Sequence, residues 1–410
     1  MKKIVIIGAG ASGLVASIFA KKNGNDVILL EKNNILGKKI LATGNGRCNY
    51  WNEDQSLNHY RSSNFEEIEK IINSENKEKI MKFFENIGIE PKVKNGYYYP
   101  FSNQATSMQK SLILEAQKNN VKIEKDVEVE DIKKIQGKFE INIKDGKKII
   151  ADKVILSTGS KVAPKTGSDG WGYKICEKFG HSIIKPLPAL VSLKTKGEFL
   201  SKWAGIRADV SVELYENNKK QAEEKGEIQL TDYGISGICV FNLSGRVARG
   251  LEENKKETVK INFLDGLKIK SQSEFIEWMN KRNEKVQNRT IFELLEGVLN
   301  YKLVDVLLKM SKIDNQERWE ELEDKKIQTL ANNIISLNLN ITGTNSFDKA
   351  QVCSGGVLLS EINVNTMESK KIEGLYITGE ILDVDGDCGG YNLEWAWITG
   401  MLAGSNCGRI

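Results

Sequence analysis

The chain has 410 residues of ordinary globular composition, of which 40% are hydrophobic and 28% are charged. A chain of this length can bury a sizeable core and is expected to form two domains. The formal net charge of +4 is small and the lysines are spread among acids, so we expect no nucleic-acid partner. No apolar run is long enough to cross a bilayer, so we expect no stable membrane association.

Cysteine and histidine usage narrow the compartment and the chemistry. The six cysteines are scattered without a C-x-x-C pair, which favours a reducing, cytoplasmic location and argues against a zinc site. Only two histidines are present, so we expect neither an imidazole-based triad nor a metal centre. His181 follows a predicted helix and is expected to be a solvated residue that interacts favourably with the helix dipole.

The N-terminal segment carries the most specific pattern in the chain. The apolar run Ile4–Ile7 predicts a buried parallel strand, and it ends at Gly8-Ala9-Gly10-Ala11-Ser12-Gly13, a G-x-G-x-x-G motif. In this motif the first glycine permits a tight turn, the second admits a pyrophosphate and the third lets the next helix lie close to the sheet. A helix is predicted from Leu14 to about Asn23, and a strand over Asp26–Leu30. Together these elements indicate a dinucleotide-binding site.

Glu31 directly follows the second predicted strand. An acid at this distance from the glycines accepts hydrogen bonds from the adenosine ribose and would repel a 2′-phosphate. The site therefore fits FAD or NAD and does not fit NADP.

The next stretch combines loops, helices and alternating segments. Ile35–Asn49 suits a loop whose backbone approaches a ligand, although a surface loop with turn glycines is the alternative. Helices are expected over Phe65–Ile89 and Ala105–Lys118, with an aromatic turn at Asn95–Pro100 between them. Alternating segments at Val121–Ile132, Phe139–Ile143 and Lys147–Ile150 predict a β-meander that returns through a buried strand to Thr158-Gly159.

From about Val191 the pattern changes to strands followed by helices, which predicts an inserted domain over residues 191–338. Residues 1–190 and 339–410 would then be the two parts of the dinucleotide-binding domain. The predicted strands of the insertion are Ala208–Tyr215, Glu227–Leu230, Gly237–Leu243 and Val259–Phe263, and its predicted helices are Ser273–Arg282, Ile291–Met310 and Asn315–Ile335.

The end of the chain returns to a glycine-rich pattern. Gly374–Glu380 predicts a buried strand that ends in a glycine and an acid. Gly389 and Gly390 precede a helix predicted over Leu393–Gly404, and their amides could face an anionic group such as the N1–C2=O edge of a reduced flavin. Gly400 and Gly404 should let this helix pack close to the sheet. The aspartates between 383 and 387 lack the later glutamate of a calcium loop, so no metal is expected.

In combination these motifs resemble the BaiN/RdsA-type flavoproteins, also described as aminoacetone-oxidase-family FAD-binding enzymes, over essentially the whole chain. The matching stretches are the glycine motif, Thr43–Asn49 with Lys38, Thr166–Ser168 with Gly170–Tyr173, Tyr233–Gly237, Gly355–Val357 with Met367–Lys370, and Gly374–Asn392. The resemblance implies an α/β fold, namely a Rossmann-like FAD-binding domain of the two-dinucleotide-binding type with a β-meander, plus an inserted β-barrel-like and helical domain. It also implies an NAD(P)H-linked oxidoreductase, and one branch is similar to enzymes that reduce conjugated carbon–carbon double bonds of 3-oxo bile acids.

The predicted site residues come from all of these stretches. Those expected to bind the cofactor are Gly8, Gly10, Ala11, Ser12, Gly13, Glu31, Lys32, Lys38, Thr43, Gly44, Asn45, Arg47, Cys48, Asn49, Val127, Thr158, Gly159, Gly379, Glu380, Asp383, Gly389, Gly390, Tyr391 and Asn392. The predicted catalytic residues are Arg47, Cys48 and Tyr391. Tyr391, or alternatively Tyr98, would donate a proton, and packing is the alternative role for Cys48.

The leading hypothesis is a reductase in which NAD(P)H delivers a hydride to FAD, and the flavin passes it to an electron-poor double bond of a small molecule. No second G-x-G-x-x-G follows the meander, so a nicotinamide would dock transiently or another reductant would serve. The alternatives are an amine or aminoketone oxidase, a flavin-dependent RNA-modifying protein and a flavin-binding redox sensor.

Overall fold

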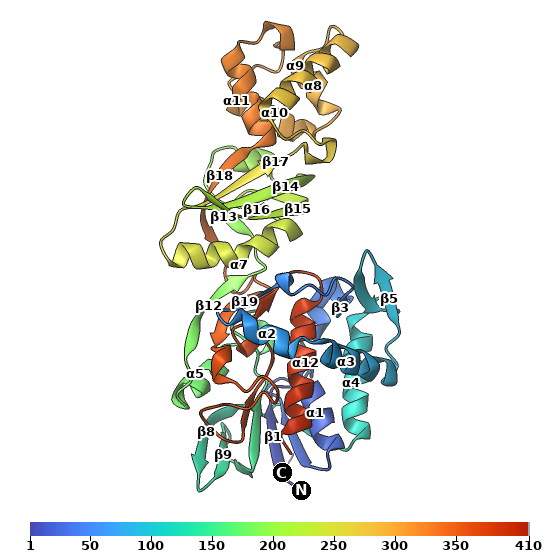
Figure 1. Ribbon diagram of the computed structural model, residues 1–410, viewed down its shortest axis with the longest axis vertical. Coiled ribbons are helices and arrows are strands. Elements are labelled where there is room, and N and C mark those ends of the chain that lie inside the picture. Colours follow the sequence, from blue (N-terminus) through green and yellow to red (C-terminus); the bar gives the residue numbers. More distant parts are fainter. Residues whose placement is uncertain (409–410) are drawn as a thin grey trace. The chain divides into compact units, whose positions relative to one another are not determined.

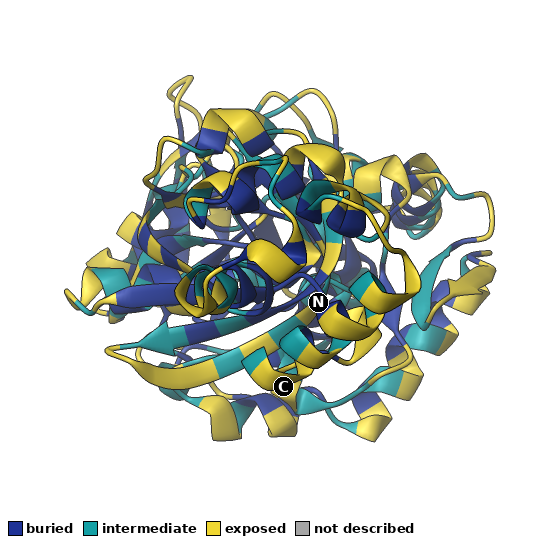
Figure 2. Cartoon of the chain, turned by 90° about the horizontal axis from the view of Figure 1, so that it is seen from above, coloured by how far each residue is buried: buried dark blue, intermediate teal, exposed yellow. Residues whose placement is uncertain are grey.

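The computed structural model describes residues 1–408, which form two compact units. The terminal unit comprises Met1–Leu187 together with the chain from Phe347 on, and the inserted unit comprises Pro188–Ser346. Each unit has its own hydrophobic core. Figure 2 shows the buried residues inside the fold and the exposed residues at its periphery.

A five-stranded parallel sheet forms the centre of the terminal unit. Its strand order is β20-β11-β1-β2-β7, with every neighbouring pair parallel. The strands are β1 (Lys3–Ile7), β2 (Asp26–Leu30), β7 (Lys122–Glu124), β11 (Lys153–Leu156) and β20 (Leu375–Ile377). Their apolar, β-branched residues are buried on both faces, as parallel strands require. The predicted Rossmann-like sheet is thus confirmed.

The helices of the terminal unit are α1 (Ala11–Lys22), α2 (Phe65–Ile71), α3 (Ser74–Asn86), α4 (Ala105–Lys118), α5 (Trp171–Lys178) and α12 (Tyr391–Asn406). The predicted helix over Phe65–Ile89 is two helices, because Asn73 caps α3 by accepting a hydrogen bond from the Asn76 amide. Helices α1 and α12, from opposite ends of the chain, pack against each other (Figure 1). Gly400 and Gly404 were predicted to let α12 pack close to the sheet. That prediction is wrong, because these glycines lie against the backbone of α1.

Short antiparallel sheets surround the parallel one. The meander consists of β8 (Val129–Ile135), β9 (Lys138–Ile143) and β10 (Lys148–Ala151), whereas β7, predicted as part of it, joins the parallel sheet. The predicted aromatic turn is a hairpin with Asn95-Gly96 at its tip, and its tyrosines lie in a strand. The remaining strands are β3 (Trp51–Asn52), β5 (Pro91–Lys94) and β6 (Tyr97–Pro100) in one sheet, β4 (Tyr60–Arg61) with β21 (Asp385–Gly386), and β12 (Ile183–Ala189) with β19 (Val352–Val357).

A closed barrel forms the core of the inserted unit, in the order β13-β16-β15-β14-β17-β18. Its strands are β13 (Leu193–Thr195), β14 (Arg207–Glu216), β15 (Lys219–Thr231), β16 (Gly234–Ser236), β17 (Glu257–Asn262) and β18 (Leu337–Thr344). Strand β18 pairs with β17 and β13 and so closes the barrel. The predicted boundary at 338/339 lies within this strand, whereas the inserted unit extends to Ser346.

Helices accompany the barrel. They are α6 (Leu200–Trp203), α7 (Ile238–Glu252), α8 (Gln272–Lys285), α9 (Ile291–Glu296), α10 (Tyr301–Met310) and α11 (Asp324–Ile335). The predicted strand Gly237–Leu243 is wrong, because these residues form the first turns of α7. The predicted helix Ile291–Met310 is two helices, and Asn300 caps the second. Among the helices of residues 1–408, none is long and apolar enough to span a membrane.

Candidate functional site

The glycine motif forms a tight loop between β1 and α1. Gly8 has a φ of +99°, and a Cβ atom there would lie 2.5 Å from the Ser157 carbonyl oxygen. A Cβ atom on Gly13 would lie 1.9 Å from the Gly8 carbonyl oxygen, so a side chain at either position would collide with backbone. The loop thus brings the start of α1 against β1 and β11, with the first helical amides lacking intrahelical acceptors.

Gly10 differs from its neighbours and tests whether a pyrophosphate fits. It is the N-cap of α1, with φ −78° and ψ −163°, and no atom lies within 4 Å of the position of an added Cβ. No side chain caps the helix. Open space before a helix N-terminus suits an anionic group, because the amides and the helix dipole both face it. The residues present therefore fit the phosphates of FAD.

Glu31 is held at the edge of this loop. It is buried, and its carboxylate accepts hydrogen bonds from the Ala9 amide at 2.8 Å and from the Asn33 amide at 2.9 Å. Val127 donates its amide to the Glu31 carbonyl. Glu31 was predicted to bind the ribose. These hydrogen bonds fix the orientation of its carboxylate within the protein itself.

A second loop, residues 163–170, is tied to the segment after Glu31. Lys32 forms an ion pair with Asp169 at 2.7 Å, and the Lys38 ammonium donates to the Lys165 carbonyl at 2.7 Å. Lys32 is thus paired with an acid, whereas Lys38 binds a neutral carbonyl. Gly159 (φ +70°) lies against the Ser168 hydroxyl, and the Thr158 hydroxyl is buried with no hydrogen-bond partner among residues 1–408.

The segment from Gly379 to Tyr391 connects the glycine loop to a second cluster of predicted residues. Gly379 lies against the Ser12 hydroxyl, and Glu380 forms an ion pair with Lys39 at 2.5 Å. The Asp383 carboxylate accepts hydrogen bonds from the Ser63 amide and hydroxyl. Sequence reasoning named the neighbouring lysine, Lys38, and missed Lys39, because no local pattern distinguishes the two.

The second cluster includes the loop at residues 43–49, whose backbone is unusual. Gly44, Asn45 and Cys48 all have positive φ, at 55°, 54° and 59°. The Thr43 hydroxyl donates to the Ile40 carbonyl at 2.6 Å, and the amide of Asn49, oriented to donate, reaches the carbonyls of Trp51 and Tyr98. These side chains thus stabilise the loop itself.

Arg47 and Cys48 occupy contrasting environments. The Arg47 side chain is exposed, and its guanidinium lies 5.1 Å from the centre of the Tyr99 ring. The Cys48 thiol is fully buried, and burial raises its pKa to about 12. A thiol with this pKa stays protonated at neutral pH, which supports the packing alternative for Cys48.

The start of α12 lies beside this loop. Gly390 (φ +102°) is its N-cap, and a Cβ atom there would lie 2.7 Å from the backbone nitrogen of Trp51. Asn392 shapes the preceding turn, because its side chain accepts from the Gly386 amide at 2.9 Å and donates to the Gly386 carbonyl at 2.7 Å. The Tyr391 hydroxyl donates to the Asp54 carbonyl at 3.0 Å, and burial raises the pKa of Tyr391.

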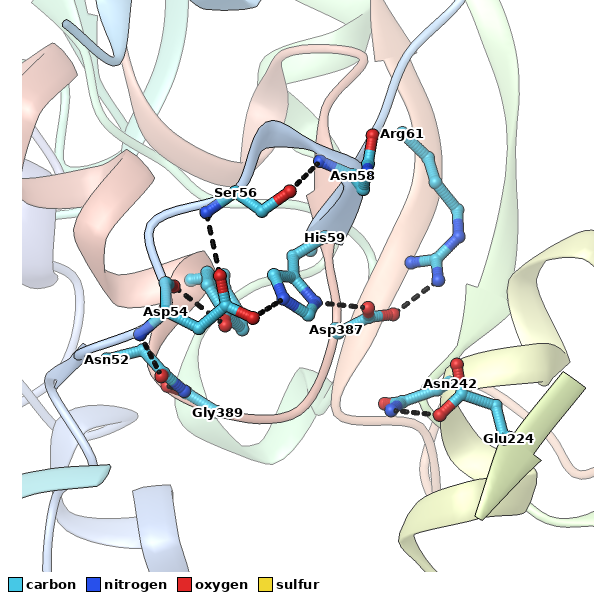
Figure 3. A network of polar contacts seen from close by, with 12 residues as sticks. Asn52, Asp54, Ser56, Asn58, His59, Arg61, Glu224, Asn242, Asp387 and Gly389 are labelled. Carbon is cyan, nitrogen blue, oxygen red and sulfur yellow. Dashed lines mark hydrogen bonds and ion pairs between the residues drawn. The ribbon is translucent and has the colours of Figure 1, made fainter. Parts of the chain in front are cut away.

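A polar network that sequence reasoning missed surrounds this turn (Figure 3). His59 lies between the carboxylates of Asp54 and Asp387, and Arg61 also contacts Asp387. The His59 ring stacks on Tyr391 with a centroid separation of 4.4 Å. No sequence pattern indicated this arrangement, because His59 and Asp387 are far apart in the chain.

His181 contradicts its predicted environment. It is buried, with Nδ1 3.0 Å from a Glu361 carboxylate oxygen and Nε2 2.8 Å from the Ser369 hydroxyl. Burial lowers its pKa, although Glu361 opposes this shift. The Ser369 oxygen also accepts hydrogen bonds from the Lys371 and Ile372 amides. His181 thus joins the segment after α5 to Glu361 and Ser369.

Buried acids with raised pKa values occur in both units. Burial raises the pKa of Glu394, in the first turns of α12, and of Asp385 to about 7. In the inserted unit, burial and the nearby Glu216 raise the pKa of Glu257 to about 7, and neither Glu257 oxygen has a hydrogen-bond partner among the described residues.

Comparison with known proteins identifies a family model and relatives that match nearly the whole chain. The family model described as HI0933-like protein Rossmann domain matches residues 2–406. The chain is 41% identical over 406 residues to a 3-dehydro-bile acid delta(4,6)-reductase of Clostridium scindens, covering 98% of each chain. It is 29% identical over 398 residues to a ribosomal RNA dihydrouridine synthase of Escherichia coli, covering 96% of this chain and 95% of that one.

Among solved structures, a 3-ketosteroid-delta4-(5alpha)-dehydrogenase from Rhodococcus jostii RHA1 superposes with a TM-score of 0.51 at 15% identity. The alignment covers 100% of this chain and 97% of the other. At this identity the likeness concerns the fold.

Proposed function

Since the chain belongs to the HI0933-like family, we propose that it is an FAD-dependent reductase acting on a carbon–carbon double bond conjugated to a carbonyl group. The observation that carries this proposal is the 41% identity, over the whole chain, to a reductase of 3-dehydro bile acids. The proposed substrate is a small molecule of the 3-oxo steroid type or another enone. The electron donor is proposed to be NADH or NADPH.

The terminal unit supplies the groups that would hold FAD. The first amides of α1 would bind the pyrophosphate, and Glu31 would accept hydrogen bonds from the adenosine ribose. The amides at the start of α12 would bind the N1–C2=O edge of the ring. When bound, FAD supplies hydride transfer between the reductant and the substrate.

The protein groups beside the start of α12 would position the substrate. Tyr97, Tyr98 and Tyr99 alternate along β6, and Tyr97 comes close to Gly389. Aromatic side chains offer flat apolar surface for a ring system. Arg47, over Tyr99, could pair with an anionic group of the substrate.

Tyr391 and Tyr98 are the proposed proton donors. Because the Tyr391 hydroxyl donates to Asp54 and its pKa is raised, transfer of its proton would require that hydrogen bond to break. Tyr391→Phe should therefore lower kcat without abolishing FAD binding. Unchanged turnover in this variant, measured at saturating substrate, would remove Tyr391 as the donor.

A second candidate substrate is RNA, because two relatives are ribosomal RNA dihydrouridine synthases, at 29% and 27% identity. Dihydrouridine is uridine whose ring double bond next to a carbonyl is saturated, so the two reactions share a bond type. The small net charge of +4 favours the small molecule. We also propose a cytoplasmic location, in agreement with six free cysteines.

Anaerobic turnover tests the proposal. Purified protein would be incubated with NADH or NADPH and a 3-oxo-4-ene steroid, and with unmodified ribosomal RNA in a parallel reaction. We expect steroid product heavier by two hydrogen atoms, detected by mass spectrometry. Product from RNA alone would support the second candidate, and peroxide formation with an amine in air would support an oxidase instead.

A further inference from the structure

His59, at the end of the short helix Leu57–His59, lies between two carboxylates (Figure 3). Its Nδ1 atom is 2.9 Å from an Asp387 oxygen, and its Nε2 atom is 3.0 Å from an Asp54 oxygen. An ionised carboxylate can only accept hydrogen bonds. Both ring nitrogens must therefore carry a proton if both aspartates are ionised.

Both aspartates accept hydrogen bonds from further donors. Hydrogen bonds from His59 and from the Ser56 amide lower the pKa of Asp54. Asp387 also accepts a hydrogen bond from the Arg61 guanidinium. Although partial burial opposes the charge on His59, its hydrogen bonds to Asp54 and Asp387 raise the pKa of the imidazole.

The charged and titratable groups around His59 come from several elements. They are Asp54 from the preceding loop, Tyr60 and Arg61 from β4, Asp385 and Asp387 from β21 and the residue after it, and Tyr391 and Glu394 from α12. Asp385, with a pKa raised to about 7 by burial, titrates above the range of an ordinary aspartate.

His59 contacts the turn before α12 in three ways. Its ring stacks on Tyr391 at an interplanar angle of 16°, its carbonyl accepts the Asp387 amide at 2.9 Å, and its side chain binds the Asp387 carboxylate. Asp54, on the other side of the ring, accepts the Tyr391 hydroxyl at its carbonyl. The ring thus joins residues 52–61 to residues 387–391.

We propose that His59 is a positioning residue, an imidazolium that holds residues 387–391 so that the Gly389 and Gly390 amides face the flavin ring. This inference rests on the FAD binding proposed above. It assigns a role to one of only two histidines in the chain. The other, His181, lies in the same unit with both ring nitrogens also within hydrogen-bond distance of partners, and so provides a matched control.

The protonation state can be observed without activity. In protein labelled with 15N-histidine and free of any tag, two histidines give two sets of ring signals, which His59→Gln assigns. At pH 6.5, the ordinary pKa of histidine, we expect His59 to be mainly doubly protonated, since its pKa is raised, and His181 to be mainly neutral, since its pKa is lowered by burial. A neutral His59 at pH 6.5 would overturn the proposal.

The positioning role is tested by FAD affinity. We expect His59→Gln, which keeps hydrogen-bonding groups but loses the charge, to weaken FAD binding about tenfold, whereas His181→Gln leaves it unchanged. In the wild-type protein, FAD affinity should fall as the pH rises through the midpoint measured for His59, because the folded imidazolium is lost there. This pH titration of the wild-type protein tests the positioning role even if His59→Gln does not fold.

Equal FAD affinity in His59→Gln and wild type, or no pH dependence across the His59 midpoint, would overturn the role. Failure of the proposed FAD binding is distinguishable, because wild-type protein would then bind no FAD at any pH, whereas failure of enone reduction alone would leave the FAD affinities and their pH dependence as predicted. The ring signals of His59 would still report its protonation state in that case.

Discussion

At the scale of single residues, the glycines of the N-terminal loop have different roles: two are required for the fold, and one is proposed to make room for the ligand. Gly13 and Gly8 lie against backbone atoms, whereas Gly10 faces open space. The G-x-G-x-x-G spacing predicted the tight turn at Gly8 and the close packing at Gly13, whereas the approach of a pyrophosphate to Gly10 stays a prediction. The polar contacts that orient Glu31, and the network around His59, could not be predicted, since they join segments distant in sequence.

The first prediction compares two alanine substitutions in this loop. Gly10→Ala should change the free energy of unfolding of the FAD-free protein by less than about 1 kcal/mol, because its backbone is extended and the space is open. It should weaken FAD binding at least about tenfold, since the methyl group occupies the space where the pyrophosphate approaches. Urea unfolding and fluorescence titration with FAD measure the two effects.

Gly13→Ala is the matched comparison. Its methyl group would lie 1.9 Å from the Gly8 carbonyl oxygen, so we expect destabilisation of about 3 kcal/mol in the FAD-free protein. Equal FAD affinity in Gly10→Ala and wild type would place the pyrophosphate elsewhere.

At the scale of elements, patterns that repeat along the chain were predicted more successfully than those that depend on packing. The strand β2 and the helix α4 have their predicted bounds, and β1 begins one residue before the predicted Ile4. The first turns of α7 were predicted as a strand because Ile238–Phe241 is apolar and partly β-branched. They form a helix because Cys239, Val240, Leu243 and Val247 face one side and pack against the barrel.

The second prediction concerns the contact between α1 and α12. A Cβ atom on Gly400 would lie 2.4 Å from the Ser12 carbonyl oxygen, so Gly400→Val should destabilise the protein by about 3 kcal/mol. Ser405→Val introduces the same side chain into the same helix at a half-buried position, and controls for the helix propensity of valine. Thermal unfolding of both variants measures the difference. Similar stabilities would contradict the close packing of the two helices.

At the scale of the whole molecule, buried acids make stability depend on pH. The folded pKa values of Glu257, Glu394 and Asp385 are about 7, above those of ordinary carboxyls. Their contribution to stability is fully present below the ordinary pKa and is lost as the pH rises through about 7. We therefore expect the free energy of unfolding to fall mainly between about pH 5 and pH 7, by up to about 1.4 kcal/mol per pH unit for each acid, and to level off above pH 7.

Glu257→Gln isolates the acid of the inserted unit. Because it removes a buried carboxylate whose oxygens have no hydrogen-bond partner among the described residues, it should raise the free energy of unfolding by about 2 kcal/mol at pH 8, and by less at pH 6. Glu253→Gln, at an exposed position nearby, should have little effect at either pH. Equal pH dependence in wild type and Glu257→Gln would show that Glu257 does not titrate in this range.

The two units also differ in what could be predicted from the sequence. The terminal unit carries the glycine motifs from which FAD was expected, whereas the extent of the inserted unit depends on β18 closing the barrel. Pairing between β13 and β18 joins residues far apart in the chain, so no local pattern marks it.

The central claim is that this chain reduces a conjugated double bond with FAD, and one measurement tests it most directly. FAD-bound protein would be reduced chemically without oxygen and mixed in a stopped-flow instrument with a 3-oxo-4-ene steroid while flavin absorbance is followed. We predict that the oxidised flavin band returns at a rate that rises with steroid concentration, with the saturated steroid as product. A flavin that stays reduced with this steroid and with a panel of smaller enones would contradict the account.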